Sequence, residues 1–222
     1  MFDSGQSVQR ILPRFFEKET SPPDPPLPKG CNTGAESERH VRAMTLDLEP
    51  ASSADVLVIR DLAERIWYAC YPGMISVDQI RYMIEWMYAP HKLASEIERG
   101  VHYWIARSGH HPAGYLAWEL LPGSPAHPVA HLHKLYLLPE WHGAGHGQHL
   151  LAQFLAQAAA AGAHTAELRV NRANTRALKA YRRAGFDLAG SVVTEIGAGF
   201  VMDDFILQRA LTQSGTTGTA SG

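Results

Sequence analysis

The sequence predicts a mixed α/β (α+β) fold, in which helices flank a central and mostly antiparallel sheet. Stretches of strand-like alternation and of helical periodicity follow one another through residues 41–211, as expected when helices pack on a sheet. Two strand patterns at 101–108 and 113–121 are separated by Gly-His-His-Pro, which favours a hairpin. A glycine-rich junction, HGAGHG at 142–147, then connects a strand pattern directly to a leucine-rich helix pattern.

The part of the domain before residue 122 should contain a first strand, two helices and the hairpin. The expected elements before the hairpin are a strand at 41–49, a helix at 54–71, a helix at 78–88 and a segment at 91–100 that closes at Gly100. Leu57, Leu62 and Ile66 recur at helical spacing and give the first helix an apolar stripe. Ser76 or Asp78 is the expected N-cap of the second helix.

The part of the domain after the hairpin should alternate strands and helices and end in a pair of strands. The expected elements are a strand at 130–138, a helix at 147–163, a strand at 165–170, a helix at 174–186, and strands near 191–196 and 200–207. Asn174 caps the second of these helices, and Gly185 stops it. The predicted order for the domain is β, α, α, β, β, β, α, β, α, β, β.

The sequence predicts one domain, at residues 41–211, between two tails. Residues 1–40 are expected to be a disordered proline-rich tail, because SPPDPPLPKG places five prolines in ten positions. Proline fits neither a helix interior nor a sheet interior. Residues 212–222 are small and polar, which is typical of a flexible terminus.

The composition argues against several functional classes. The chain has 222 residues, and 45% of them are hydrophobic, so one domain can bury a sizeable core. Its net charge of −2 and the lack of a basic run argue against nucleic-acid binding. No apolar stretch is long enough to span a membrane, and the first residues show no signal-peptide pattern. The two cysteines, Cys31 and Cys70, stand far apart, which favours a reduced, cytoplasmic protein over the alternative of one disulfide between them.

The junction at 142–147 has the features of an anion-binding site. A helix N-terminus presents four unpaired N–H groups and a partial positive charge, and glycines remove the side chains that would hold a ligand away. The alternative is a tight strand-to-helix turn that merely needs glycine. The junction has no Gly-Lys-Ser/Thr of a P-loop, and Gln148 stands where a dinucleotide-binding fingerprint needs its third glycine.

A second segment adds specificity to the junction. HGAGHG follows the pattern Gln/Arg-x-x-Gly-x-Gly/Ala, with His142 in place of the usual Gln or Arg. NTRALKAYRRAGF at 174–186 carries an Asn, a helix with Tyr181, and a closing Gly-Phe. On these two motifs the chain resembles the GCN5-related N-acetyltransferase (GNAT) superfamily. The resemblance implies a GNAT domain at 41–211, with a sheet of six to seven strands splayed at the cofactor site and about four flanking helices.

The resemblance also implies acetyl-CoA as the donor of the acetyl group. The strand before the junction would splay from its neighbour after residues 135–137 and pair its free backbone groups with the pantetheine arm. The N–H groups of the junction would bind the diphosphate, and Asn174 would contact the cofactor near the thioester while it also caps its helix. The expected cofactor-binding residues are Leu135, Tyr136, Leu137, His142, Gly143, Ala144, Gly145, His146, Gly147 and Asn174.

Acetyl transfer to an amine requires a proton acceptor, a proton donor and stabilisation of the carbonyl oxygen. Tyr181 stands where the resemblance places the general acid, although by itself it also reads as a core aromatic on the face of Ala177. A backbone N–H near Leu137 would stabilise the oxyanion. His133 occupies a strand position where related enzymes often carry a glutamate, and histidine can accept a proton near pH 7. We therefore expect His133 or an ordered water to be the base.

Other polar residues offer weaker candidates. Glu119 on the preceding strand is a further candidate base, and Arg169 stands where some relatives carry a second glutamate. The side chains predicted to share one face of the strand before the junction are those of His131, His133, Leu135 and Leu137. No Cys, Asp or Glu completes a convergent set with the histidines, so no metal is expected.

The acceptor pocket should lie against the first two helices and the loop of the last strand pair. Trp67 and Tyr71 are four residues apart on one helix, so both rings can face this pocket. Four acidic residues could attract a cationic amine: Glu85, Glu195, Asp203 and Asp204. A polyamine, a peptide N-terminus, an amino-sugar drug or an amino acid all stay open as acceptors. A homodimer is retained as one assembly state.

Three hypotheses follow for the function. The first is an acetyl-CoA-dependent N-acetyltransferase that acts on a primary amine of a small molecule or peptide. The second is a non-catalytic acetyl-CoA-binding sensor or partner domain, which the absence of the usual glutamates favours and Tyr181 opposes. The third is a nucleotide-binding oxidoreductase, which the glycine spacing argues against.

Overall fold

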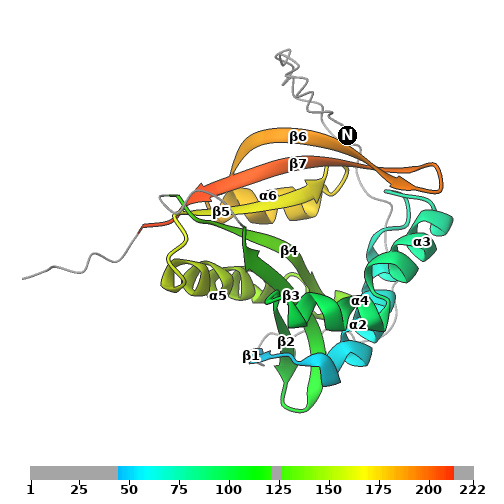
Figure 1. Cartoon of the computed structure of the whole chain (residues 1–222), viewed down its shortest axis with the longest axis horizontal. Coiled ribbons are helices and arrows are strands. Elements are labelled where there is room, and N and C mark those ends of the chain that lie inside the picture. Colours follow the sequence, from blue (N-terminus) through cyan, green and yellow to red (C-terminus); the bar gives the residue numbers. More distant parts are fainter. Residues whose placement is uncertain (1–44, 122–126, 213–222) are drawn as a thin grey trace, which may run out of the picture.

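The computed structural model describes residues 45–121 and 127–212, and the tails predicted at 1–40 and 212–222 lie outside these residues except for Thr212. The predicted mixed α/β fold is confirmed (Figure 1). The helices are the short 3₁₀ helices η1 (Ser53–Asp55) and η2 (Pro139–Trp141) and the α-helices α2 (Val56–Cys70), α3 (Val77–Met87), α4 (Pro90–Glu98), α5 (His146–Ala160) and α6 (Thr175–Arg183).

The described residues form one sheet of seven strands in the order β1-β2-β3-β4-β5-β7-β6. The strands are β1 (Asp47–Pro50), β2 (His102–Ser108), β3 (His111–Leu120), β4 (Val129–Leu137), β5 (Thr165–Asn171), β6 (Asp187–Gly197) and β7 (Phe200–Ala210). Every neighbouring pair is antiparallel except β4 and β5, which run parallel. Of the strand predicted at 41–49, residues 41–44 lie outside the described residues and β1 begins at Asp47, while the last two strands are longer than predicted.

The helix boundaries follow the capping residues that the sequence contains. The Ser76 side chain accepts a hydrogen bond from the Gln79 N–H and caps α3, so Ser76 rather than Asp78 is the N-cap. Pro90 begins α4, where its missing N–H has no helical partner to lose. A third helix therefore precedes the hairpin, and the predicted order with only two helices there was incomplete.

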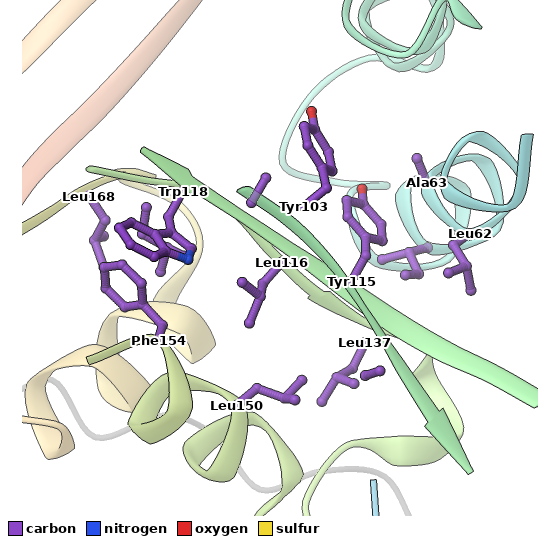
Figure 2. Packing of buried hydrophobic residues seen from close by; sticks show 14 of the residues in the cluster. Leu62, Ala63, Tyr103, Tyr115, Leu116, Trp118, Leu137, Leu150, Phe154 and Leu168 are labelled. Atoms are coloured by element: carbon purple, nitrogen blue, oxygen red, sulfur yellow. The ribbon is translucent and has the colours of Figure 1, made fainter. Parts of the chain in front are cut away.

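The core lies on both faces of the sheet, as Figure 2 shows. On one face Tyr115 points toward Leu62 and Ala63 of α2. On the other face Leu116 and Leu137 point toward Leu150 of α5, while Trp118 meets Phe154 with its ring centroid 5.9 Å away. The strand alternation of β3 thus separates a helix α2 side from a helix α5 side.

A β-bulge in β4 overturns the predicted alternation of that strand. Ala117 pairs with Lys134 and Trp118 with Leu132, so His133 is the extra residue. Beyond His133, the bulge exchanges the residues that face one side of the sheet with those that face the other side. His131 and His133 consequently share a face with Lys134 and Tyr136, whereas Leu135 and Leu137 face α5. The prediction that His131, His133, Leu135 and Leu137 share one face was wrong for this reason.

The sheet separates between β4 and β5. Their parallel ladder contains four residue pairs and ends at Leu132 and Leu168, whereas β4 stays paired with β3 to Leu137. Figure 1 shows β4 diverging from β5 as it runs toward the helices α2 and α3. The splay therefore begins earlier than predicted, at residue 132 rather than after residues 135–137.

Candidate active site

A cavity of about 860 Å³ lies where the two parts of the sheet separate. Its walls come from α2, α3, β4, the 142–147 junction, the first turns of α5, the length of α6, and strands β5, β6 and β7. The volume falls in the range of pockets that bind small molecules and cofactors. The open edge of β4 runs along this cavity, from His133 to Leu137.

The backbone of β4 presents unpaired groups to the cavity at alternate residues. The Leu138 N–H donates to the Ala113 carbonyl at 2.9 Å, which sets the phase of the antiparallel ladder with β3. The backbone groups of Tyr136 therefore point toward β3, and those of Leu135 and Leu137 point toward the open edge. One of these groups is already used, because a ring nitrogen of His142 lies 2.8 Å from the Leu137 carbonyl oxygen.

The junction at 142–147 opens its backbone to the same cavity. Gly143 and Gly145 have φ angles of +80° and +92°, a left-handed conformation that glycine adopts without strain. A Cβ at either position would contact nothing within 4 Å, and a Cβ at Gly147 would contact only the Leu137 side chain at 3.9 Å. The first N–H groups of α5 therefore border open space and can reach an anion.

His142 connects the junction to α6. One ring nitrogen, Nε2, lies 2.8 Å from the Leu137 carbonyl oxygen, and the other, Nδ1, lies 2.6 Å from a guanidinium nitrogen of Arg176. Since a carbonyl only accepts and Arg176 only donates, the neutral ring with its proton on Nε2 satisfies both contacts. Burial, and next the Arg176 charge, lower the pKa of His142 below its usual value. Arg176, which the sequence did not single out, thereby gains a fixed position beside the junction.

Helix α6 contributes Asn174 and Tyr181 to the cavity wall. The Asn174 side chain accepts a hydrogen bond from the Ala177 N–H at 3.1 Å and caps the helix, as predicted. Tyr181 is half-buried, and its ring meets Phe186 edge-on with centroids 5.9 Å apart. Burial raises the pKa of Tyr181, and the neighbouring Tyr71 raises it further, so its phenol stays protonated at neutral pH.

Three aromatic residues form another part of the cavity wall. Trp67 and Tyr71 stack at 4.4 Å with an interplanar angle of 10°, so the prediction that both rings share one helical face is confirmed. The Tyr71 hydroxyl lies 3.2 Å from the Tyr136 hydroxyl. Among the described residues no acceptor pairs with the buried indole N–H of Trp67. This wall offers flat apolar surface together with hydroxyl groups.

Two histidine–carboxylate pairs lie side by side near the start of the splay. His131 Nδ1 lies 3.1 Å from a Glu167 oxygen, and His133 Nε2 lies 2.9 Å from a Glu119 oxygen. Burial lowers the pKa of His131 and also that of His133. Both rings are therefore neutral at pH 7. The pairing orients each ring through one nitrogen and leaves the other available.

A buried ion pair beneath these histidines was not predicted. The Lys134 ammonium lies 3.1 Å from a Glu96 oxygen and 2.7 Å from the Tyr103 hydroxyl. Burial alone would raise the pKa of Glu96, but the Lys134 charge outweighs it and the net pKa is lowered. Because Lys134 follows the bulge, simple alternation assigned it to the opposite face, and only the strand register reveals its position.

Strand β7 brings a carboxylate into the cavity. Asp204 is only 3% exposed and lines the cavity, and burial raises the pKa of its carboxyl group. The sequence grouped Asp204 with Glu85, Glu195 and Asp203, but the cavity wall includes Asp204 alone of these four residues. Arg169 of β5 also lines the cavity, where some relatives were expected to carry a glutamate.

The structure brings most of the predicted site residues together. The predicted residues in the cavity wall are Trp67, Tyr71, His133, Leu135, Tyr136, Leu137, His142, Gly143, Gly145, Gly147, Asn174 and Tyr181. Ala144 and His146 of the junction are not part of this wall. His146 is buried and packs edge-on against Trp141, with ring centroids 5.2 Å apart.

Within residues 45–121 and 127–212, no three His, Cys, Asp or Glu side chains are grouped so as to hold a metal ion. Over the same residues, every helix is too short or too polar to cross a membrane.

Comparison with known families defines the class of the protein. The model of the acetyltransferase (GNAT) family matches residues 60–186, which include most of α2, the junction and Tyr181. The match covers more than half of the chain. The chain therefore belongs to the GNAT acetyltransferase family, as its two motifs predict.

The curated relatives narrow the class no further. Uncharacterized N-acetyltransferases from Mycobacterium bovis and Mycobacterium tuberculosis are 40% identical to this chain over 80 residues, which is 36% of this chain and 51% of each relative. The chain thus spans about half the length of the curated relatives that it matches.

Solved structures share the fold. The PaiA N-acetyltransferase of Thermoplasma acidophilum, in complex with coenzyme A, has a TM-score of 0.63 at 24% identity, over 75% of this chain and 99% of that chain. YncA of Salmonella typhimurium, with acetyl-CoA, has a TM-score of 0.54 at 15% identity, over 80% of this chain and 99% of that chain. The ribosomal-protein-S18-alanine N-acetyltransferase of Escherichia coli has a TM-score of 0.58 at 14% identity, over 78% of this chain and 98% of that chain. At these identities the likeness concerns the fold alone.

Proposed function

We propose that the chain transfers an acetyl group from acetyl-CoA to a primary amine of a small molecule or peptide. One observation carries the proposal: the open edge of β4, the glycine junction and the Tyr181 side chain all border a single cavity. The open edge and the junction suit the pantetheine arm and the diphosphate of coenzyme A, and Tyr181 can act as a general acid beside them. A cytoplasmic location fits the predicted reduced cysteines.

The cavity suits acetyl-CoA by its backbone and by its charge. The unpaired backbone groups of Leu135 would pair with the pantetheine amides in the manner of an added strand. The N–H groups of the junction would bind the diphosphate. Cationic side chains of α6 that line the cavity would complement the phosphates, namely Arg176, Lys179 and Arg183. The Tyr136 side chain, rather than its backbone, would face the reacting group.

Acetyl-CoA would supply an activated thioester carbonyl at this place. Tyr181 would then donate its proton to the departing thiolate, since the raised pKa of its phenol keeps it protonated at neutral pH. The N–H of Leu137 points to the open edge and would stabilise negative charge on the carbonyl oxygen. Asn174 would hold the start of α6 and contact the cofactor arm.

The attacking amine must lose a proton, and we assign the role of the base that receives this proton to His133. Its Nε2 faces Glu119, so Nδ1 is the nitrogen that can receive a proton directly or through an ordered water. The lowered pKa of His133 keeps the ring neutral at pH 7, and Glu119 would stabilise the ring once it is protonated. Trp67 and Tyr71 would contact the body of the acceptor.

Release of free thiol from acetyl-CoA in the presence of a panel of primary amines tests the proposal. The panel should include a polyamine, peptides with free N-termini, amino acids and an aminoglycoside. Turnover with at least one amine is the expected result. Tight acetyl-CoA binding without thiol release from any amine would instead favour the sensor hypothesis.

A further inference from the structure

The carboxylate of Asp204 is buried at a place where no structural role explains it. Asp204 lies in the middle of β7, between Asn171 of β5 and Val192 of β6, and is 3% exposed. Its neighbour Asp203 points to the opposite side of the sheet and forms an ion pair with Arg172 at 2.5 Å. Only Asp204 of this acidic pair lines the cavity.

The Asp204 carboxylate has no donor to satisfy it within the described part of the chain. From residues 45–121 and 127–212, no hydrogen bond and no ion pair reaches either oxygen, and Arg169 acts on the carboxylate only through its charge at longer range. Burial raises the pKa of Asp204, and the Asp203 carboxylate raises it further. An unpaired buried carboxylate destabilises a protein, so a partner from outside the chain would relieve this penalty.

The surroundings of Asp204 suit an organic cation. Asp204 acts electrostatically on Tyr71, which stacks on Trp67 and lies 3.2 Å from the Tyr136 hydroxyl. Aromatic faces attract alkylammonium groups, and a carboxylate beside them adds an opposite charge. Met202 and Thr194 of the same strand pair complete this part of the wall.

The two carboxylates of the cavity wall differ in what they can bind. Glu167 is occupied, because one oxygen contacts His131 at 3.1 Å and the other accepts from Gln208 at 2.7 Å. Asp204 alone of the two has its oxygens available. The cationic side chains that would bind the cofactor phosphates lie on α6. The Asp204 carboxylate lies on β7, where it can bind a second ligand that is positively charged.

We propose that Asp204 binds the ammonium group of the acceptor, and that the acceptor is therefore a primary amine that enters the cavity as a cation on an apolar or aromatic body. This inference rests on the proposed function, because it assigns a substrate class to the same cavity. It narrows that class by disfavouring acceptors that carry a carboxylate beside the amine, as free amino acids do, since Asp204 would repel the second group.

Matched pairs of charged and neutral probes test the inference. The probes are 2-phenylethylamine with 2-phenylethanol, and 1,4-diaminobutane with 1,4-butanediol, titrated by calorimetry into protein saturated with coenzyme A at pH 7.5. We expect at least one amine to bind the wild-type chain about tenfold more tightly than its alcohol, which corresponds to about 1.4 kcal/mol. Equal affinity within both pairs, or no binding by either amine, would overturn the inference.

Two variants assign the preference to one carboxylate. Asp204→Asn should remove the preference for the amine, whereas Asp203→Asn, the neighbouring change on the opposite side of the sheet, should keep it. Persistence of the preference in Asp204→Asn would contradict the inference.

The free energy of unfolding provides a second readout. Asp204→Asn should stabilise the free protein at pH 7, because the raised folded pKa of Asp204 means that ionisation at neutral pH favours the unfolded chain. A carboxylate kept for structure would show the opposite sign.

The same samples separate this inference from the proposed function. Coenzyme A titration and thiol release are measured beside the probe titrations. Without coenzyme A binding, probe titrations of the free protein still report the amine preference. An amine preference without coenzyme A binding or thiol release would leave the Asp204 site standing and remove the acetyltransferase. Thiol release without a preference for the amine would leave the acetyltransferase standing and remove the Asp204 site. Thiol release together with an amine preference that persists in Asp204→Asn would have the same meaning.

Discussion

The two walls of the cavity are built in different ways. The wall proposed for the cofactor consists largely of backbone, from Leu135 through the junction to the first turn of α5, all within one short segment. The wall proposed for the acceptor consists of side chains from segments far apart in the sequence, including Trp67, Tyr136 and Asp204. A constant ligand can be recognised by backbone groups, whereas a ligand that varies within a family is read by side chains that can change without altering the fold.

The two walls also differ in charge. Arg176, Lys179 and Arg183 lie on the α6 side, whereas Asp204 lies on β7. This separation predicts that changes in one wall affect one ligand and leave the other ligand bound. Variants in either wall therefore test that independence, and Tyr181→Phe has the largest expected effect.

The variant Tyr181→Phe tests the point where the two walls meet. We expect turnover to fall by a factor of about 10² to 10⁴, the range for loss of a general acid, because the departing thiolate loses its proton donor. Coenzyme A affinity, measured by calorimetry, should change less than threefold. Turnover equal to that of the wild-type chain would show that another group is the acid.

The variant Gly147→Asp tests the cofactor wall alone. A carboxylate in the first turn of α5 interacts favourably with the helix dipole, so the melting temperature should stay constant or rise. The same charge should repel a diphosphate and weaken coenzyme A binding by about tenfold or more. Gly147→Ala is the neutral control, and a Cβ there meets only the Leu137 side chain at 3.9 Å. Equal coenzyme A affinity of the Asp and Ala variants would argue against a diphosphate at the junction.

The variant His133→Gln tests the assigned base. We expect kcat/KM for the best amine to fall by about tenfold, less than for loss of Tyr181, because an ordered water can still carry the proton to solvent. The loss should be largest near neutral pH and should shrink at high pH, where more of the amine is already neutral. Glu119→Gln should give a smaller change of the same kind. A constant loss at every pH would point to a packing effect.

Acidification should destabilise the protein through three histidines of the cavity wall. Burial lowers the folded pKa of His131, His133 and His142 below the value of 6.5 for an unperturbed side chain. Below pH 6.5 the unfolded chain therefore binds more protons than the folded chain, so the free energy of unfolding falls as the pH drops toward the folded pKa values. His142→Gln, which restores the residue usual in the family pattern, should make this slope shallower. Urea denaturation at a series of pH values from 7.5 to 5 measures how the free energy of unfolding depends on pH in both proteins.

The sequence predicted the cofactor wall better than the acceptor wall, for a physical reason. Capping residues, the left-handed glycines and the N-terminus of α5 act within a few residues, so local pattern reveals them. The position of Asn174 as a helix cap is a case in point. The fold class followed from the same local signals.

The rest depends on pairing between distant strands. The bulge at His133 changes which β4 side chains reach the cavity, and it is visible only in the register between Ala117 and Lys134. Asp204 differs from three other acidic residues by its burial, which arises from β5, β6 and β7 together. The contact of Arg176 with His142 joins residues 34 positions apart. No local pattern encodes these three features.

The most direct test is a calorimetric comparison of coenzyme A with pantetheine, which lacks the phosphates. We expect coenzyme A to bind at least about 100-fold more tightly, the difference to shrink as salt is added, and Gly147→Asp to remove most of it. Equal affinity for the two compounds, at any salt concentration, would contradict the assignment of residues 142–147 as a diphosphate-binding site and with it the proposed acetyl transfer.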